Sequence, residues 1–238
     1  MRVAAIDCGT NSLRLLVADV EPGAGRLTDV DRRMEIVRLG QGVDFTGRLA
    51  PEALERTLRA LRGYARIIGD QSAEAVRMVA TSATRDAANA ADFVRGVSGV
   101  LGLEPEVLSG QEEAYLSFVG AAAVVDATQA RTLVGLAGSV TTVAGIALDL
   151  PGYDAERLHH AQLSAAQVHE VTIRLLNQTR AERARIPVMH PGRIDVIGAG
   201  ALILDRIMTR LGFAEVLVSE HDILDGIAWS IATPDPAR

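Results

Sequence analysis

The first half of the chain combines two hydrophobic periods, one typical of strands and one typical of helices. Two apolar runs, Val3–Ile6 and Leu13–Val20, flank a short polar turn and predict a β-hairpin. From Pro51 onwards the apolar residues recur on one helical face, and proline suits the first position of a helix. The further elements expected in this half are strands at 34–39, 75–80 and 106–109, a helix ending near 100, and a helix over 111–125.

The order of these elements, βββαβαβα, is the ribonuclease H-like pattern, which underlies the actin and sugar-kinase superfamily of two facing halves. The second half of the chain does not repeat it. Two strands at 131–137 and 215–218 accompany helices at 140–148, 164–178, 193–211 and 223–231. Because two strands are marginal without extra packing, we expect an α/β fold with a ribonuclease H-like domain over 1–123 and an incomplete second half over 124–238. The second half would need to pack against the first half or against a partner subunit, so a homodimer is one expectation.

Composition narrows the classes of function. The chain has 24 basic and 30 acidic residues and a net charge of −6, so a broad nucleic-acid surface is not expected. It contains no lysine, which excludes a Walker-type phosphate loop, protein-kinase chemistry and Schiff-base catalysis. The single cysteine, Cys8, cannot form an internal disulfide, and no leader or apolar run of membrane length is seen. We therefore expect a cytoplasmic protein that contacts no membrane and no nucleic acid.

The polar turn between the first two strands is the first candidate site. Its side chains and backbone N–H groups can face a phosphate, and Asp7 at the strand end can hold Mg²⁺ directly or through water. The same residue types also favour an ordinary hairpin turn, so both interpretations stay open. The candidate phosphate-binding residues of this turn are Gly9, Thr10, Asn11 and Ser12.

Two later strand-to-helix junctions carry charged residues suited to phosphate chemistry. Arg85 follows the polar run Thr81–Thr84 and can neutralise a phosphate with its planar guanidinium, although a capped helix with a solvated arginine is the simpler explanation. Glu112 and Glu113 open the next helix, where acidic residues are common for reasons of the helix dipole alone. Only one of the two can act as a general base over a site, because adjacent helical residues point in different directions.

A third strand–turn–helix junction contains Gly138 and Ser139. This turn can cradle a phosphate or the face of a nucleotide, or its glycines can simply allow close packing of helix against strand. The five histidines show no spacing typical of metal ligands and are interpreted as surface or core residues.

The order of these motifs closely resembles the exopolyphosphatase/guanosine-pentaphosphate phosphohydrolase family. The matching segments are Asp7–Ser12 with Arg14, Thr81–Ala83 with Arg85, Asn89 and Phe93, Ser109–Ala114, Gly138–Thr142, Tyr153–Asp154, and Ser219 with Asp225–Gly226. The resemblance implies hydrolysis of a terminal phosphate from polyphosphate or guanosine pentaphosphate, assisted by Mg²⁺. By position it implies that Glu113 is the catalytic base, that Asp7–Ser12 is the first phosphate loop, and that Arg85 contacts the polyanion.

The chain departs from that family at one point. The family's second phosphate loop, an Asp-Ile-Gly-Gly-Gly-Ser run, has no match, and a segment is expected to be missing between Ala121 and Arg131. Losing a single transition-state donor costs about 100- to 1000-fold in rate, so losing a loop matters for activity. Three hypotheses stay open: an active phosphohydrolase, a homologue that binds polyphosphate or a guanosine alarmone without turnover, and a structural role with an inherited site. A sugar or acetate kinase is a weaker alternative, because such kinases also need the second loop.

Overall fold

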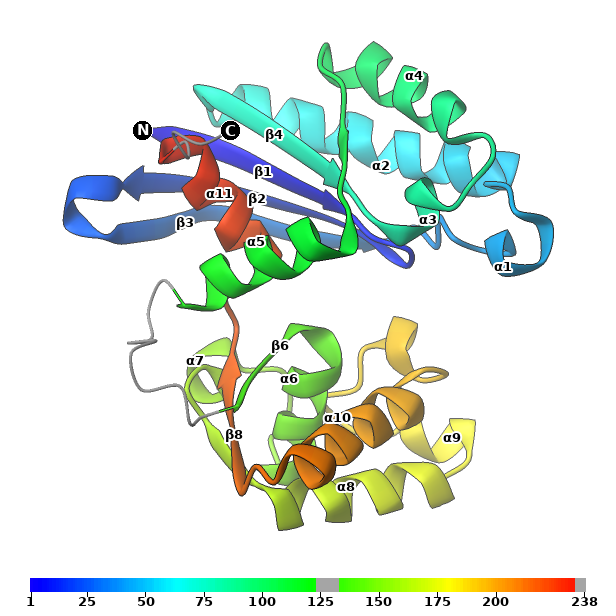
Figure 1. Cartoon of the computed structure of the whole chain (residues 1–238), viewed down its shortest axis with the longest axis vertical. Coiled ribbons are helices and arrows are strands. Elements are labelled where there is room, and N and C mark those ends of the chain that lie inside the picture. The colour runs from blue at the N-terminus through cyan, green and yellow to red at the C-terminus, as the bar shows by residue number, and fades with distance from the viewer. Residues whose placement is uncertain (123–132, 234–238) are drawn as a thin grey trace. The chain divides into compact units, whose positions relative to one another are not determined.

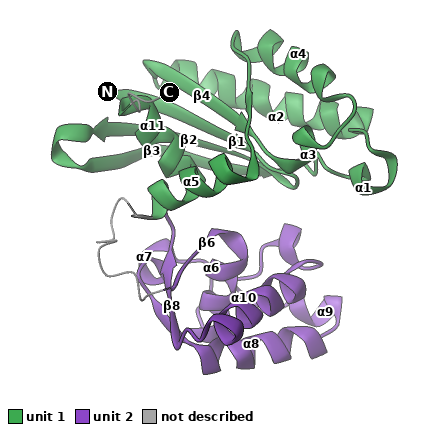
Figure 2. Cartoon of the chain, viewed as in Figure 1, with its two compact units in different colours: residues 1–123, 223–238 green, residues 124–222 purple. Residues whose placement is uncertain are grey.

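The computed structural model describes residues 1–122 and 133–233 and divides the chain into two compact units (Figure 2). Unit 1 consists of Met1–Ala123 and Ile223–Arg238, and unit 2 consists of Val124–Asp222. This division corrects the expected domain assignment of the last helix, which belongs to unit 1 and not to a domain over 124–238. The physical reason is its apolar face, which completes a core on the sheet of unit 1.

A five-stranded mixed sheet forms the centre of unit 1 (Figure 1). Its strand order is β3-β2-β1-β4-β5, with an antiparallel β1–β2–β3 meander, β4 parallel to β1, and β5 parallel to β4. This order confirms the ribonuclease H-like fold expected for the first half. The strands are β1 (Arg2–Cys8), β2 (Ser12–Glu21), β3 (Arg26–Ile36), β4 (Ala75–Ala80) and β5 (Glu106–Val107).

Helices cover both faces of this sheet (Figure 1). Because side chains alternate along a strand, β1 supplies Ala4 and Ile6 to a core with α2 and α4, and Val3 and Ala5 to a second core with α5 and α11. The helices of unit 1 are η1 (Pro22–Ala24), α1 (Val43–Thr46), α2 (Pro51–Asp70), α3 (Ser82–Arg85), α4 (Ala90–Leu101), α5 (Gly110–Ala122) and α11 (Ile223–Ala232).

The third strand is longer than its apolar pattern predicts. β3 begins at Arg26, well before Met34, and pairs with almost the whole of β2. Residues 26–33 are mostly polar, since β3 lies at the edge of the sheet and much of it is exposed to solvent. An edge strand of this kind shows no hydrophobic alternation, so sequence periodicity detects only its end.

Unit 2 contains a smaller sheet. Its strand order is β6-β8-β7, with β6 and β8 parallel and β7 antiparallel to β8. In the described part of unit 2 the sheet has three strands, where a complete ribonuclease H-like half has five, which agrees with the expected incomplete second half. The strands are β6 (Leu133–Leu136), β7 (Gln162–Ser164) and β8 (Glu215–Ser219).

The helices of unit 2 pack around one apolar core that includes Val143, Val168, Leu204 and Val218. Two of them, α8 and α9, begin with a capping box, in which the N-cap hydroxyl and the third helical side chain bond each other's backbone N–H. None of the helices in the described parts of the chain is long and apolar enough to cross a membrane. The helices of unit 2 are α6 (Ala137–Ala147), α7 (Ala155–Leu158), α8 (Ala165–Asn177), α9 (Arg180–Arg183), η3 (Pro191–Arg193) and α10 (Ile197–Leu211).

Candidate functional site

The turn between β1 and β2 is held in shape by the loop that follows β3. The Gly9 N–H donates to the Ser12 carbonyl at 3.0 Å, and the Asn11 carbonyl accepts N–H bonds from both residues after β3, at 3.0 and 2.8 Å. Gly40 lies against the turn so closely that a Cβ there would come within 2.4 Å of Thr10 Cγ2. Glycine at position 40 therefore allows the loop to pack directly against the turn.

The first two sequence motifs meet at a pair of hydroxyl groups. Thr10 Oγ1 and Ser82 Oγ lie 2.8 Å apart, although the two residues are 72 positions apart in the chain. They meet because β1 and β4 are parallel neighbours, so the turns at their carboxyl ends lie at the same edge of the sheet. One hydroxyl hydrogen joins the two oxygens, and the other can donate to a bound anion.

Asp7 forms an ion pair with Arg14 directly across the β1–β2 ladder. The two residues are partners in the strand register, and Arg14 Nη2 lies 2.5 Å from Asp7 Oδ2. Asp7 is 4% exposed. A carboxylate this deeply buried needs such a partner to stay ionised. The pair therefore places one negative and one positive charge at the base of the turn.

At the junction between β5 and α5, the two adjacent glutamates differ in their hydrogen bonds. Glu112 Oε2 accepts bonds from the backbone N–H and the hydroxyl of Ser109, both at 2.9 Å, so Glu112 caps the helix. The spacing Ser-x-x-Glu is the sequence signal of this capping arrangement. Arg85 approaches from α3 and donates from Nη1 to the Leu108 carbonyl at 2.8 Å. Glu113 takes no part in the cap, which leaves its side chain for another role.

Glu113 shares its surroundings with the charges of the β1–β2 turn. Burial raises the pKa of Glu113, and the negative charge of Asp7 raises it further, whereas the guanidinium groups of Arg85 and Arg14 lower it. The net direction is upward. A half-buried carboxyl with a raised pKa, beside two cations and a polar turn, is suited to proton transfer at a phosphate site.

The donor set fits a magnesium ion held mainly by its substrate. Within residues 1–122 and 133–233, no three His, Cys, Asp or Glu side chains are grouped so that they could bind a metal by themselves. Mg²⁺, however, is often bound by one or two carboxylates together with water and phosphate oxygens. The negative charges of Asp7 and Glu113 repel each other, and a bound cation would reduce this repulsion. Among the site residues described in unit 1, Asp7 and Glu113 are carboxylates of the kind that such an ion binds.

In unit 2, Gly138 and Ser139 form the turn that opens α6. The Arg193 guanidinium lies over this turn, and a Cβ at position 138 would come within 2.1 Å of its Cζ. Arg193 Nη1 also donates to Thr142 Oγ1 at 3.2 Å, and that hydroxyl donates to the Gly138 carbonyl at 2.6 Å. The sequence analysis missed Arg193, because no spacing relates it to a turn more than fifty residues earlier.

The predicted site residues thus fall into two groups. Those of the β1–β2 turn lie in unit 1 with Arg85 and Glu113, and the hydroxyl pair and the mutual charge effects join them. Gly138 and Ser139 lie in unit 2 with Arg193.

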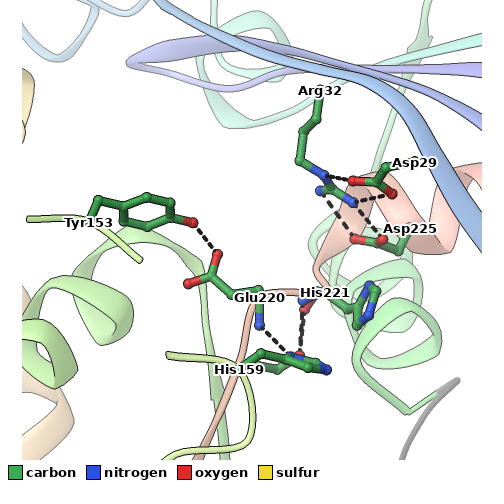
Figure 3. Close-up of polar contacts among 8 residues, drawn as sticks. Asp29, Arg32, Tyr153, His159, Glu220, His221 and Asp225 are labelled. Carbon is green, nitrogen blue, oxygen red and sulfur yellow. Dashed lines mark hydrogen bonds and ion pairs between the residues drawn. The ribbon is translucent and has the colours of Figure 1, made fainter. Parts of the chain in front are cut away.

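Three of the five histidines gather in unit 2, although their spacing gave no sign of it. The His159 ring stacks on His160 with centroids 3.8 Å apart and meets His221 edge-on at 4.8 Å. His159 Nδ1 accepts the backbone N–H of Glu220 at 3.2 Å, and the Glu220 carboxylate accepts the Tyr153 hydroxyl (Figure 3). Because Nδ1 accepts a hydrogen bond, a neutral His159 carries its proton on Nε2, which leaves no lone pair there for a metal.

Comparison with known proteins places the chain among related sequences and folds. The chain is 40% identical to "Exopolyphosphatase 2" of Mycobacterium tuberculosis over 314 residues, which cover 97% of this chain and 98% of that protein. Because this chain has only 238 residues, part of those 314 aligned positions has no counterpart here. The place at which a segment was expected to be missing, between Ala121 and Arg131, lies largely outside the described residues.

Solved structures match along almost the whole chain. A crystal structure of an exopolyphosphatase-like protein has 31% sequence identity and a TM-score of 0.90, and covers 97% of each chain. The Aquifex aeolicus member of the Ppx/GppA protein family, at 24% identity, has the same fold, with a TM-score of 0.84 over 98% of this chain and 97% of that chain. The profile of the Ppx/GppA phosphatase family matches residues 16–150. With a relative 40% identical along nearly its full length, this chain belongs to the Ppx/GppA phosphatase family.

Proposed function

We propose that the chain hydrolyses the terminal phosphoanhydride of inorganic polyphosphate or guanosine pentaphosphate, with Glu113 as the general base. The observation that supports this most is the electrostatic environment of Glu113, in which burial and the charge of Asp7 raise its pKa and the guanidinium groups of Arg85 and Arg14 lower it. A base with a raised pKa is better matched to a water nucleophile near neutral pH. The 40% identity to an exopolyphosphatase supports the class of substrate.

In this proposal the β1–β2 turn and the β4–α3 junction bind the terminal phosphate. The free hydrogen of the Thr10–Ser82 hydroxyl pair donates to a phosphate oxygen, and the remaining N–H groups of Arg85 neutralise its charge. The backbone of Gly9, Asn11 and Ser12 sets the shape of the turn. These contacts hold the phosphate while Glu113 accepts a proton from the attacking water.

Asp7 is the proposed ligand of Mg²⁺. A bound Mg²⁺ would offset the negative charge that develops on the phosphate oxygens. Arg14 holds the Asp7 carboxylate through Oδ2, and this fixes the orientation in which the carboxylate meets its ligand. In unit 2, Gly138 and Ser139 with Arg193 are the proposed second set of phosphate contacts. A cation beside the N-terminus of α6 favours an anion at this turn.

The second candidate function is binding of polyphosphate or a guanosine alarmone without turnover. It is favoured by the three strands of the unit 2 sheet in the described part of the chain, and by the aligned positions of the M. tuberculosis relative that have no counterpart here. Removal of one transition-state donor costs about 100- to 1000-fold in rate, and removal of a loop costs more. Ligand binding tolerates such a loss better than catalysis does.

Phosphate release from polyphosphate and from guanosine pentaphosphate, with Mg²⁺, distinguishes the two. We expect wild type to release phosphate, Glu113→Gln to lose about 100-fold or more of the rate, and Glu112→Gln to stay near wild type, because glutamine can still accept the cap bonds. If folded wild type releases no phosphate but its Tm rises when polyphosphate is added, the function is binding without turnover and not hydrolysis. Neither response would refute both candidate functions.

A further inference from the structure

A buried ion pair anchors the last helix to the edge strand of unit 1. Asp225, in the first turn of α11, is 1% exposed, and its Oδ1 lies 2.7 Å from Nη2 of Arg32 on β3 (Figure 3). Arg32 Nε also lies 2.7 Å from Asp29 Oδ2. Burial alone would lower the pKa of Arg32, but the charge of Asp225 and the bonds and charge of Asp29 outweigh this and raise it. The guanidinium therefore stays charged and ties α11 to one place on the sheet.

The next residue sets the contact between α11 and α5. A Cβ at Gly226 would lie 1.9 Å from the backbone carbonyl oxygen of Leu116 and 3.2 Å from the backbone nitrogen of Gly120. Both atoms belong to the backbone of α5, so neither can rotate away as a side chain could. The two helices thus touch backbone to backbone, and only glycine at 226 allows this separation.

This contact lies one helical turn from the proposed base. Leu116 follows Glu113 by three residues on α5 and is 2% exposed in the core that α5 and α11 share with β1 and β2. A shift of α5 at Leu116 therefore moves Glu113 with it, because the helix behaves as a rigid rod over one turn. The proposed phosphate contacts, on the β1–β2 turn and at Ser82 and Arg85, do not lie on α5 and would stay in place.

We propose that Arg32, Asp225 and Gly226 are positioning residues: the ion pair fixes α11, and Gly226 then sets the distance of α5, and so of Glu113, from the phosphate-binding turn. This rests on the proposed function only for the role of Glu113. The position of its carboxyl group can be measured whether or not the chain hydrolyses a substrate.

Gly226→Ala tests the proposal. Real Cβ contacts do not fall below 3.0 Å, so the new methyl group at 1.9 Å from the Leu116 oxygen must push α5 away by about 1 Å. A displacement of that size between reacting groups costs about 100-fold in rate. We expect kcat to fall by that factor while KM changes little, because the phosphate contacts are unmoved.

The matched control is Gly99→Ala on α4, where a new Cβ meets nothing within 4 Å. The readout that does not depend on turnover is the titration of Glu113, followed by ¹³C NMR of its side-chain carboxyl in metal-free protein. We expect its pKa to change in Gly226→Ala and to stay at the wild-type value in Gly99→Ala. If wild type shows no turnover, hydrolysis is wrong, and this titration still decides the positioning.

A folded Gly226→Ala protein with wild-type kcat and a wild-type Glu113 titration would overturn the proposal, and so would a loss carried by KM alone. If Gly226→Ala does not fold, Asp225→Asn replaces it, because the amide keeps the shape and loses the charge that holds Arg32. We then expect a smaller fall in kcat with KM retained. Wild-type kcat and titration in folded Asp225→Asn would overturn the proposal equally.

Discussion

The two partners of the Arg32–Asp225 pair should contribute unequally to the stability of unit 1. The side chain of Asp225 is 1% exposed, whereas that of Arg32 is 31% exposed. Arg32 has a second carboxylate in Asp29, at 2.7 Å. Removing the guanidinium therefore takes a cation away from a buried carboxylate, whereas removing the Asp225 charge leaves a guanidinium that keeps Asp29 and reaches water.

This asymmetry sets the expected loss in the free energy of unfolding for each variant. Arg32→Met should cost about 3–5 kcal/mol in the free energy of unfolding, the usual result of breaking a buried pair from one side. Asp225→Asn should cost about 1.5–3 kcal/mol, the contribution of a hydrogen bond to a charged group. The double variant Arg32→Met with Asp225→Leu should recover much of the loss, because an apolar pair of similar volume leaves no buried charge.

Urea unfolding followed by tryptophan fluorescence measures these differences. Trp229 is the only tryptophan of the chain and lies on α11 itself, so its emission reports the unit in question. A loss of 3–5 kcal/mol lowers the midpoint by roughly 1–3 M urea. An Asp225→Asn protein less stable than Arg32→Met, or a double variant no better than Arg32→Met, would refute the reasoning.

Two further predictions concern proton transfer and packing. Because burial and the charge of Asp7 raise the pKa of Glu113, and a general base must be deprotonated, phosphate release should decline as the pH falls through a value above the ordinary pKa of glutamate. Arg85→Met removes a charge that lowers this pKa, so the acid limb of the pH–rate profile should move to higher pH; an unmoved limb would contradict the assignment of Glu113. Tyr64→Phe should lower the free energy of unfolding by about 1–3 kcal/mol, because the buried hydroxyl donates to the Leu13 carbonyl at 3.0 Å. Equal urea midpoints for this variant and wild type would argue against that bond.

Much of unit 1 could be predicted from local patterns. The runs that became β1, β2 and β4 are apolar on both faces because helices cover the sheet on both sides, so they stand out against polar turns. The first part of β3 was missed because an exposed edge strand has no buried face to mark it. β7 was missed because it has only three residues, too few to show a period.

Candidate site residues could be predicted where polar or charged residues stand at a turn in the sequence. They could not be predicted where they are brought together only by tertiary packing. The turn after Asp7 could be located because its small polar residues interrupt two apolar runs, although the same residue types also occur in ordinary hairpin turns. The choice between Glu112 and Glu113 needed the structure, although the Ser-x-x-Glu spacing could have assigned Glu112 to the cap. Arg193 carried no local signal at all, since its contact with Gly138 arises only when η3 folds back on α6.

By itself, the sequence determined the ribonuclease H-like order of the first half, the place of the polar turn between β1 and β2, and the lack of any lysine. These follow from hydrophobic periods, turn residues and composition, which act over a few neighbouring positions. Only the tertiary structure decided that α11 belongs to unit 1 and that Arg32 pairs with Asp225 across 193 positions of the chain. Such contacts depend on which faces pack together, and a local period records that a face is apolar but not what will cover it.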